Sequence, residues 1–196
     1  MRAMTGLTLA TAVFLSTGCS GVLRAGADFE PGYDFSQYTG YTWDEPDNLP
    51  TGDPRLDNNP FFVHRLHSAI HYELATRGIQ FGHGEGPEPT LTVHHHASVR
   101  DRVEVFEGEG QVPGYEYREG TEVHQYEEAT FLVDIADART GDLVWRGWAQ
   151  LDLAMVLADP DVMRQQIDEA IRRMFESFPI APGSDPTPPT SAREGR

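Results

Sequence analysis

The chain contains a single cysteine, Cys19, and therefore cannot form an intramolecular disulfide. Its fold must rest on a hydrophobic core even in an oxidising compartment. The apolar patterns described below fall within about 150 residues, enough for one domain that buries roughly 70% of its unfolded surface. No internal repeat is visible in the sequence. We therefore predict a single domain over residues 29–179 that is stabilised by packing alone.

The first 18 residues have the layout of a secretory signal. Arg2 gives a short positive end, Ala3 to Leu15 form a mostly apolar run, and small residues follow as far as Gly18. The apolar run has 13 residues, whereas a helix needs roughly 20 to cross the hydrocarbon core of a bilayer. The pattern therefore predicts a targeting segment over residues 1–18 that is removed from the mature protein.

The small residues that lead to Cys19 resemble the lipobox of bacterial lipoprotein precursors. The family usually has Leu three positions before the cysteine, where this chain has Ser16. The resemblance implies lipidation of the Cys19 thiol and acylation of the new amino terminus, for example with palmitate. Two or more acyl chains hold a protein stably on a membrane. Ser20 is not the Asp that typically retains such proteins at the inner membrane, so we expect the periplasmic face of the outer membrane.

The protein is strongly acidic, with a formal net charge of −16 at pH 7. Its 31 acidic residues stand against 15 arginines, and it has no lysine. Phosphate binding depends on clustered cations, so this balance excludes nucleic acid as a partner and disfavours anionic lipid headgroups.

Two segments beside the predicted domain lack the apolar content of a core. Residues 19–28 are mostly small and polar and predict a tether between the lipid and the domain. Residues 180–196 are rich in Pro, Ser, Thr and Gly and predict a disordered tail. A solvated tail is the simpler interpretation, and a proline-rich docking segment is the alternative.

Two amphipathic helices are predicted. The first begins after Asn59, which can cap it, and ends before Gly78, which tolerates a left-handed conformation. Its apolar stripe consists of Val63, Leu66, Ile70 and Leu74. The second begins at Asp159 and Pro160 and stops at Pro179. Its predicted inward residues are Met163, Ile167, Ala170, Ile171, Met174 and Phe178.

The strand-like segments are residues 38–43, 91–105, 129–136 and 143–153. The last two are joined by the turn DARTGD and predict a hairpin, in which Gly141 tolerates positive φ. Trp145 and Trp148 are three residues apart and therefore face opposite sides of an ideal strand. The fold class that follows is α+β, a two-layer sandwich of an antiparallel sheet with two helices packed on one face.

Five segments of the chain occur in an order that is typical of one bacterial family. They are DFSQYTGYTW, LATRGI, LTVHHH, the hairpin ATFLVDIADARTGDLVWRGWA and the closing helix. This pattern resembles the lipoprotein family called domain of unknown function 4136, over roughly residues 27–179. The resemblance implies a lipoprotein signal and an α+β domain, and it carries no established activity.

Histidines form two candidate sets of metal ligands. Alternate side chains of a strand share a face, so His94 and His96 point one way and His95 the other. The first helix carries three histidines on one stripe beside its apolar face: His64, His67 and His71. Where that helix packs over the strand, neutral imidazoles from both elements can converge on a transition metal. Histidines at the edge of a core that bind backbone or water are the more common arrangement.

The sequence shows no motif for catalysis. It has no GxSxG, no free cysteine once Cys19 is lipidated, and no recognisable triad order. Carboxylates are abundant, and no pattern places one in a dry pocket that would raise its pKa. The acidic loop over residues 44–57 lacks the spacing of a hand-type calcium loop. We therefore predict a protein that is not an enzyme, or at least one without a visible catalytic motif, with no cofactor and no small-molecule substrate identified.

Two classes of function follow. The first is a non-enzymatic binding or structural module, anchored in the cell envelope through Cys19. Such a module would contact another envelope protein through a sheet edge, through the tyrosine-bearing loop 107–120, or through its tail. The second is a His-dependent periplasmic metal-binding protein that uses His94 and His96 with the helix histidines. The first is favoured, because a metal site usually takes three or four protein ligands and the sequence fixes only two.

Overall fold

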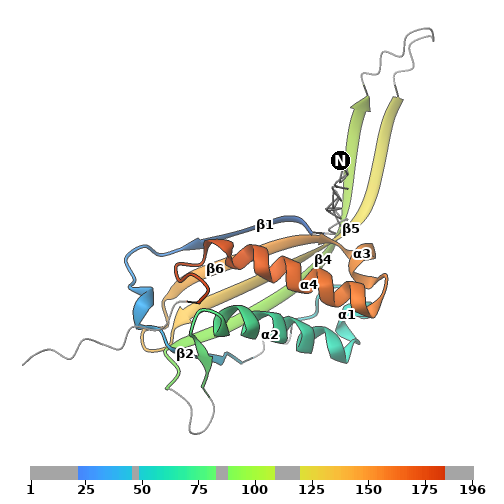
Figure 1. Ribbon diagram of the computed structural model, residues 1–196. Helices are drawn as coiled ribbons and strands as arrows, with labels where there is room; N and C mark the ends of the chain where they lie inside the picture. The colour runs from blue at the N-terminus through green and yellow to red at the C-terminus, as the bar shows by residue number, and fades with distance from the viewer. Residues whose placement is uncertain (1–21, 46–48, 83–87, 109–119, 184–196) are drawn as a thin grey trace, which may run out of the picture.

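A six-stranded sheet carries helices on one of its faces (Figure 1). The computed structural model describes residues 22–45, 49–82, 88–108 and 120–183. The strands are β1 (Val22–Phe29), β2 (Gly40–Trp43), β3 (Gln80–Phe81), β4 (Leu91–Gly108), β5 (Gly120–Asp137) and β6 (Leu143–Asp152). The helices are η1 (Phe35–Gln37), α1 (Pro54–Asp57), α2 (Pro60–Ala75), α3 (Leu153–Leu157), α4 (Pro160–Met174) and η2 (Phe175–Ser177).

The order of strands in the sheet is β1-β6-β5-β4-β2-β3. The four strands β1, β6, β5 and β4 pair antiparallel, whereas β2 pairs parallel to both β4 and β3. The predicted α+β fold is therefore confirmed, but the sheet is mixed and not antiparallel throughout. The cause is helix α2, which lies between β2 and β4 in the chain. This helix returns the chain to the end of the sheet where β2 began, so that β4 can run in the same direction as β2.

Strand β1 corrects the predicted tether of residues 19–28 over residues 22–28, and residues 19–21 lie outside the described part of the chain. It pairs with β6 from Val22 opposite Leu151 to Phe29 opposite Trp145. Ala25 and Ala27 pack against the core. The sequence pattern was misleading because the core-facing residues of this edge strand are small, so its composition resembles that of a linker. Backbone pairing with β6, more than side-chain burial, holds it in place.

Both long helices form where the sequence predicts them. Asn59 caps α2 by accepting a hydrogen bond from the Phe61 backbone, and Gly78 after its end has a φ of 79°. One predicted core residue is wrong, because Val63 is 45% exposed and Phe62 is buried instead. Asp159 caps α4, and all six of its predicted inward residues are buried. The short helices α1 and α3 are additions that the sequence pattern did not predict.

The β5–β6 hairpin and its two tryptophans agree with prediction. Gly141 in the turn has a φ of 77°. Trp145 is fully buried, whereas Trp148 lies on the opposite face and is 37% exposed. The Trp145 ring lies over Gly147, where an added Cβ would be only 2.2 Å from a ring carbon. The strand therefore needs glycine at that position to hold the tryptophan in the core.

Strands β4 and β5 extend beyond the rest of the sheet. Each has 18 residues, and they pair from Leu91 opposite Asp137 to Gly108 opposite Gly120. Strand β6 accompanies β5 only as far as Glu128. Residues 101–108 and 120–127 therefore form a two-stranded ribbon, called the arm below, that projects from the body (Figure 1).

Candidate functional site

A pair of histidines meets on the core-facing side of the sheet. The Nε2 atoms of His67 on α2 and His95 on β4 lie 2.6 Å apart. Their ring centroids are 4.7 Å apart, with the ring planes at 72°. At this distance one Nε2 carries the proton and the other accepts it, so the contact favours at least one neutral imidazole.

Trp43 on β2 completes this cluster. Its ring stacks on His67, with centroids 3.9 Å apart and planes at 10°, and meets His95 edge-on at 6.0 Å. Burial lowers the pKa of His67, and the nearby His64 lowers it further. His67 therefore stays neutral at pH 7 and keeps a lone pair for a proton or a metal ion.

His71, one turn further along α2, has a structural partner. Its Nδ1 atom lies 2.9 Å from the Tyr41 hydroxyl. Burial raises the pKa of Tyr41 to about 12, so the hydroxyl is protonated at neutral pH and can donate this hydrogen bond. The contact links α2 to β2 through the Nδ1 atom of His71.

The strand histidines alternate as predicted, but a different one meets the helix. His94 and His96 lie opposite Asp134 and Leu132 on the helix-free face of the sheet, and His94 Nδ1 is 4.0 Å from an Asp44 carboxylate oxygen. The structure therefore does not bring His94 to the α2 histidines, and His96 comes near them only as part of the lining of a cavity beside the His67–His95 pair. His95 could have been found from its neighbours, because Val93 and Ala97 on either side of it are apolar and share its face.

A cavity of about 480 Å³ lies beside the histidine pair. Its lining includes Leu49, Thr51, Phe62, His67, His95 and His96. The loop that closes it is held to β4 by a hydrogen bond of 2.6 Å from the Val99 backbone to the Thr51 carbonyl. Two carboxylates of this loop make contacts within the loop: Asp53 caps α1 and pairs with Arg55, and Asp57 accepts a hydrogen bond from the Thr51 backbone.

Within the described residues, no group of three or more His, Cys, Asp or Glu side chains could hold a metal ion.

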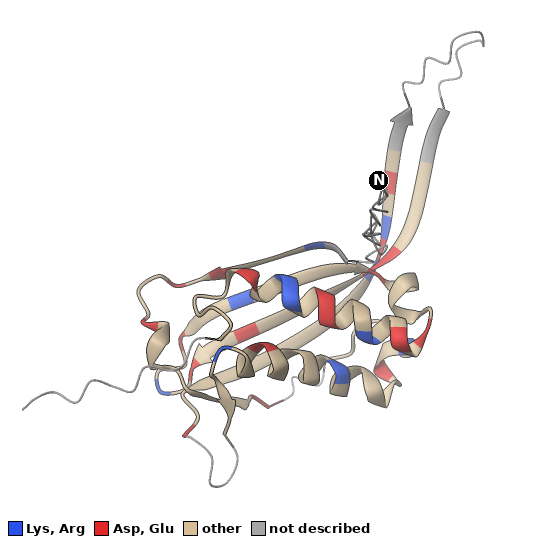
Figure 2. Cartoon of the chain, viewed as in Figure 1, with Lys and Arg blue, Asp and Glu red and all other residues tan. Residues whose placement is uncertain are grey.

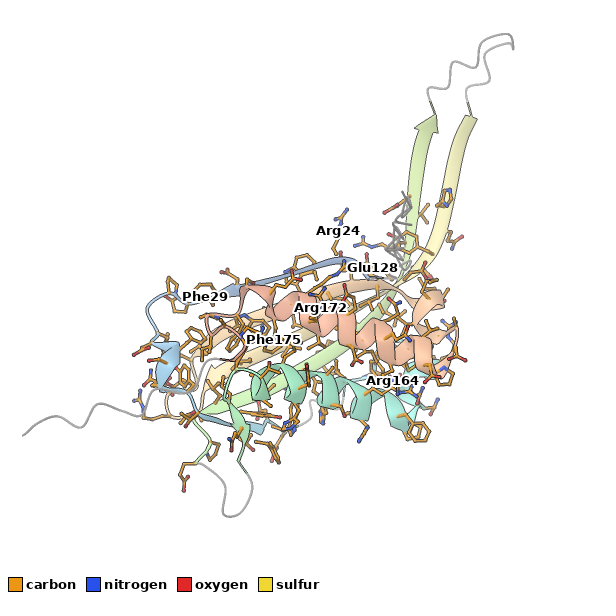
Figure 3. All side chains as sticks on the ribbon, in the orientation of Figure 1. Arg24, Phe29, Glu128, Arg164, Arg172 and Phe175 are labelled. Atoms are coloured by element: carbon orange, nitrogen blue, oxygen red, sulfur yellow. The ribbon has the colours of Figure 1, made fainter. Side chains whose placement is uncertain are left out.

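His64 lies apart from the pair, in a groove between α2 and α4. This α2–α4 groove encloses about 720 Å³ and is lined by His64, Arg65, Ser68, Ala69, Tyr72, Glu73, Arg164, Gln165, Asp168, Glu169 and Arg172. Arg164 and Arg172 are spaced along the α4 side (Figure 3). Acidic and basic residues are interspersed along α4, whereas α2 carries only Arg65 and Glu73 (Figure 2). Burial raises the pKa of Asp168, and Arg164 opposes this effect.

Three sequence-predicted features lie outside the described residues. They are Cys19, most of the tyrosine-bearing loop, and residues 184–196 of the tail. The described end of the tail includes Ile180, which packs against the core. Among the described helices, none is long and apolar enough to span a bilayer.

A family model described as "Domain of unknown function (DUF4136)" matches residues 26–180. The chain belongs to this family. The resemblance read from the sequence over residues 27–179 is thus confirmed. The DUF4136 match begins within β1 and ends just after η2, so it covers the second half of β1, the other five described strands and the helical layer.

Two solved structures of low sequence identity align with this chain. A PDZ domain protein from Parabacteroides distasonis ATCC 8503 aligns with a TM-score of 0.52 and 15% identity. The alignment covers 82% of this chain and 36% of that protein, so the DUF4136 chain corresponds to about a third of its length. A PelC dodecamer structure from Paraburkholderia phytofirmans aligns with a TM-score of 0.38 and 11% identity, over 77% of this chain and 97% of the other. No curated protein matches the sequence.

Proposed function

We propose that this DUF4136 protein is a lipid-anchored protein of the cell envelope that acts as a non-enzymatic binding module. The observation that carries the proposal is that β1 begins at Val22, three residues after Cys19. Three residues span at most about 11 Å. Lipid on Cys19 would therefore hold the folded sheet directly at the membrane surface, where it can contact other envelope components.

The α2–α4 groove supports the binding role. Tyr72 in the groove and Phe61 at the start of α2 are 66% and 64% exposed. Aromatic residues and arginine are enriched in protein interfaces, and the groove also presents Arg164 and Arg172. The partner that fits this surface is another envelope protein, with apolar side chains for the tyrosine and acidic groups for the arginines.

The anchor is tested with a Cys19→Ser variant of the full chain. We expect the wild-type protein to fractionate with membranes and to need detergent for release, and the variant to be soluble in the periplasm. Intact-mass measurement of the wild type should show the added diacylglyceryl and acyl groups. A matched Ser20→Asp variant should remain membrane-bound and move towards the inner-membrane fraction. A wild-type protein that is soluble and carries no lipid would contradict the proposal.

The binding role is tested in the same cells. A photo-crosslinking amino acid at Tyr72 should give one discrete adduct in the membrane fraction. The control position is Thr140, which is exposed in the β5–β6 turn and should give none. Equal labelling at both positions would contradict a specific interface at the groove.

A second candidate function, periplasmic metal binding, is favoured by the contact between His67 and His95. A metal ion would replace the shared proton, with His67 and His95 as two ligands and water from the adjoining cavity as a third. For this function we expect one equivalent of zinc or copper by elemental analysis. A His67→Ala, His95→Ala variant would lose it, and the matched His94→Ala, His124→Ala variant, whose histidines lie outside the lining of the cavity, would keep it. Metal-free wild-type protein that stays folded would reject this candidate and leave the first intact.

A further inference from the structure

The arm carries three exposed valines on one of its faces, called the valine face below, outside the core. Val103, Val105 and Val123 are 57–59% exposed, and Val105 lies directly opposite Val123. By strand alternation they lie on the side of the sheet that includes Val93 and Ala97, which the helices cover in the body. The two strands of the arm extend past the helical layer (Figure 1), and these valines are exposed there.

The opposite face of the arm is polar. The Tyr126 hydroxyl donates a hydrogen bond of 2.9 Å to Glu104, and His124 lies opposite Glu104 in the register. Arg102 lies opposite Tyr126 on the same face and pairs with Glu128 at 3.1 Å. The two faces of the arm therefore differ: one carries the three exposed valines together with Asp101, Gln125 and Glu127 nearer the body, and the other carries the polar contacts named here. A two-stranded ribbon is marginally stable by itself in water, so covering the valine face would stabilise it.

Strand β1 starts at the base of this arm. Val22 lies opposite Leu151 of β6, which lies opposite Ala129 of β5, and Ala129 lies opposite Val99 of β4. The arm begins two residues beyond Val99. Strand β1 runs away from the arm, so its first residue is the one nearest to it (Figure 1).

The connection from Cys19 to β1 is shorter than the arm, and this limits how far a lipid on Cys19 can lie from the base of the arm. Cys19 lies within about 11 Å of Val22, whereas the eight residues of each arm strand extend about 27 Å at 3.4 Å per residue. A bilayer that holds the lipid of Cys19 therefore lies beside the base of an arm that is longer than the connection.

We propose that the valine face of the arm lies against the lipid bilayer as a second membrane contact beside the lipid on Cys19. This inference rests on the proposed lipid anchor. The surface that fits is zwitterionic, because the arm also carries the exposed Asp101 and Glu104 and the chain has a net charge of −16. The same charge disfavours a second copy of the chain as the cover, since two such surfaces repel each other.

The test uses the full lipidated chain in phosphatidylcholine vesicles. Because Cys19 is the only native cysteine, the variants Val103→Cys, Val105→Cys and Val123→Cys each add one free thiol for a polarity-sensitive fluorophore. We expect blue-shifted emission at these three positions and loss of emission when nitroxide-labelled lipid is included. The matched controls are His124→Cys on the polar face and Thr140→Cys in the β5–β6 turn, which should keep the emission of a probe in water.

The other possible results show whether the arm contact fails alone or together with the lipid anchor. Valine-site probes that behave like the Thr140 probe, on protein that remains in the vesicles, would overturn the arm contact and leave the anchor standing. Val105→Cys chains that join as disulfide dimers would assign the face to a second copy and also overturn the inference. A wild-type chain that takes up label at Cys19 carries no lipid, and then the proposed anchor and this inference fail together.

Discussion

Replacing Trp145 by Ala should destabilise the protein by about 3–5 kcal/mol, the cost that is typical of removing a large aromatic side chain from a packed core. Trp145 is fully buried, and its ring lies 4.7 Å from that of Phe175 and 5.5 Å from that of Phe178. These contacts join β6 to the chain that follows α4, so the loss should weaken both layers. Urea unfolding monitored by far-UV circular dichroism measures the change.

Trp148 provides the control on the same strand. It is on the helix-free face and packs over Gly26 of β1, so Trp148→Ala should cost less than about 1 kcal/mol. Equal costs for the two variants would show that the faces of β6 are assigned wrongly. Trp145→Phe should recover most of the stability, because the buried indole Nε1 has no hydrogen-bond partner among the described residues and the smaller ring leaves none unpaired.

The elements that sequence reasoning predicts well are those with strong local signals. Asn59 and Asp159 cap their helices with side-chain oxygens, and Gly141 adopts the positive φ that its turn needs. The inward stripe of α4 follows from its spacing alone. The prediction that Val63 is buried is wrong, because the larger Phe62 beside it occupies the buried position. Which of the two is buried depends on the sheet beneath the helix.

Features that depend on distant partners could not be read from the sequence. Strand β1 exists because β6 offers it an edge, and Ala25 and Ala27 give no strong strand signal. The parallel direction of β2 follows from the route of the chain through α2. For the candidate site, the alternation of 94–96 is predictable, but the meeting of His95 with His67 depends on where α2 crosses β4.

The second large effect is expected at the buried ion pair between Arg77 and Glu73. The arginine Nη1 lies 2.5 Å from a Glu73 carboxylate oxygen, and the two side chains are 4% and 10% exposed. Arg77 also donates a hydrogen bond of 2.8 Å to the Phe175 carbonyl and lies over the Phe175 and Phe178 rings. It thereby connects the end of α2 with η2, and its charge is compensated chiefly by Glu73.

Glu73→Ala should therefore cost about 3–5 kcal/mol, because it leaves a buried guanidinium without its counter-ion. The exposed pair of Arg172 and Glu169 on α4 is the control, and Arg172→Ala should cost less than about 1 kcal/mol in the same unfolding assay. A Glu73→Leu, Arg77→Met double variant removes both charges and should recover much of the loss, since apolar residues often replace a buried ion pair at little cost. If the double variant were instead as unstable as Glu73→Ala, the hydrogen bond from Arg77 to Phe175 would be the dominant contribution, and the charge pair a minor one.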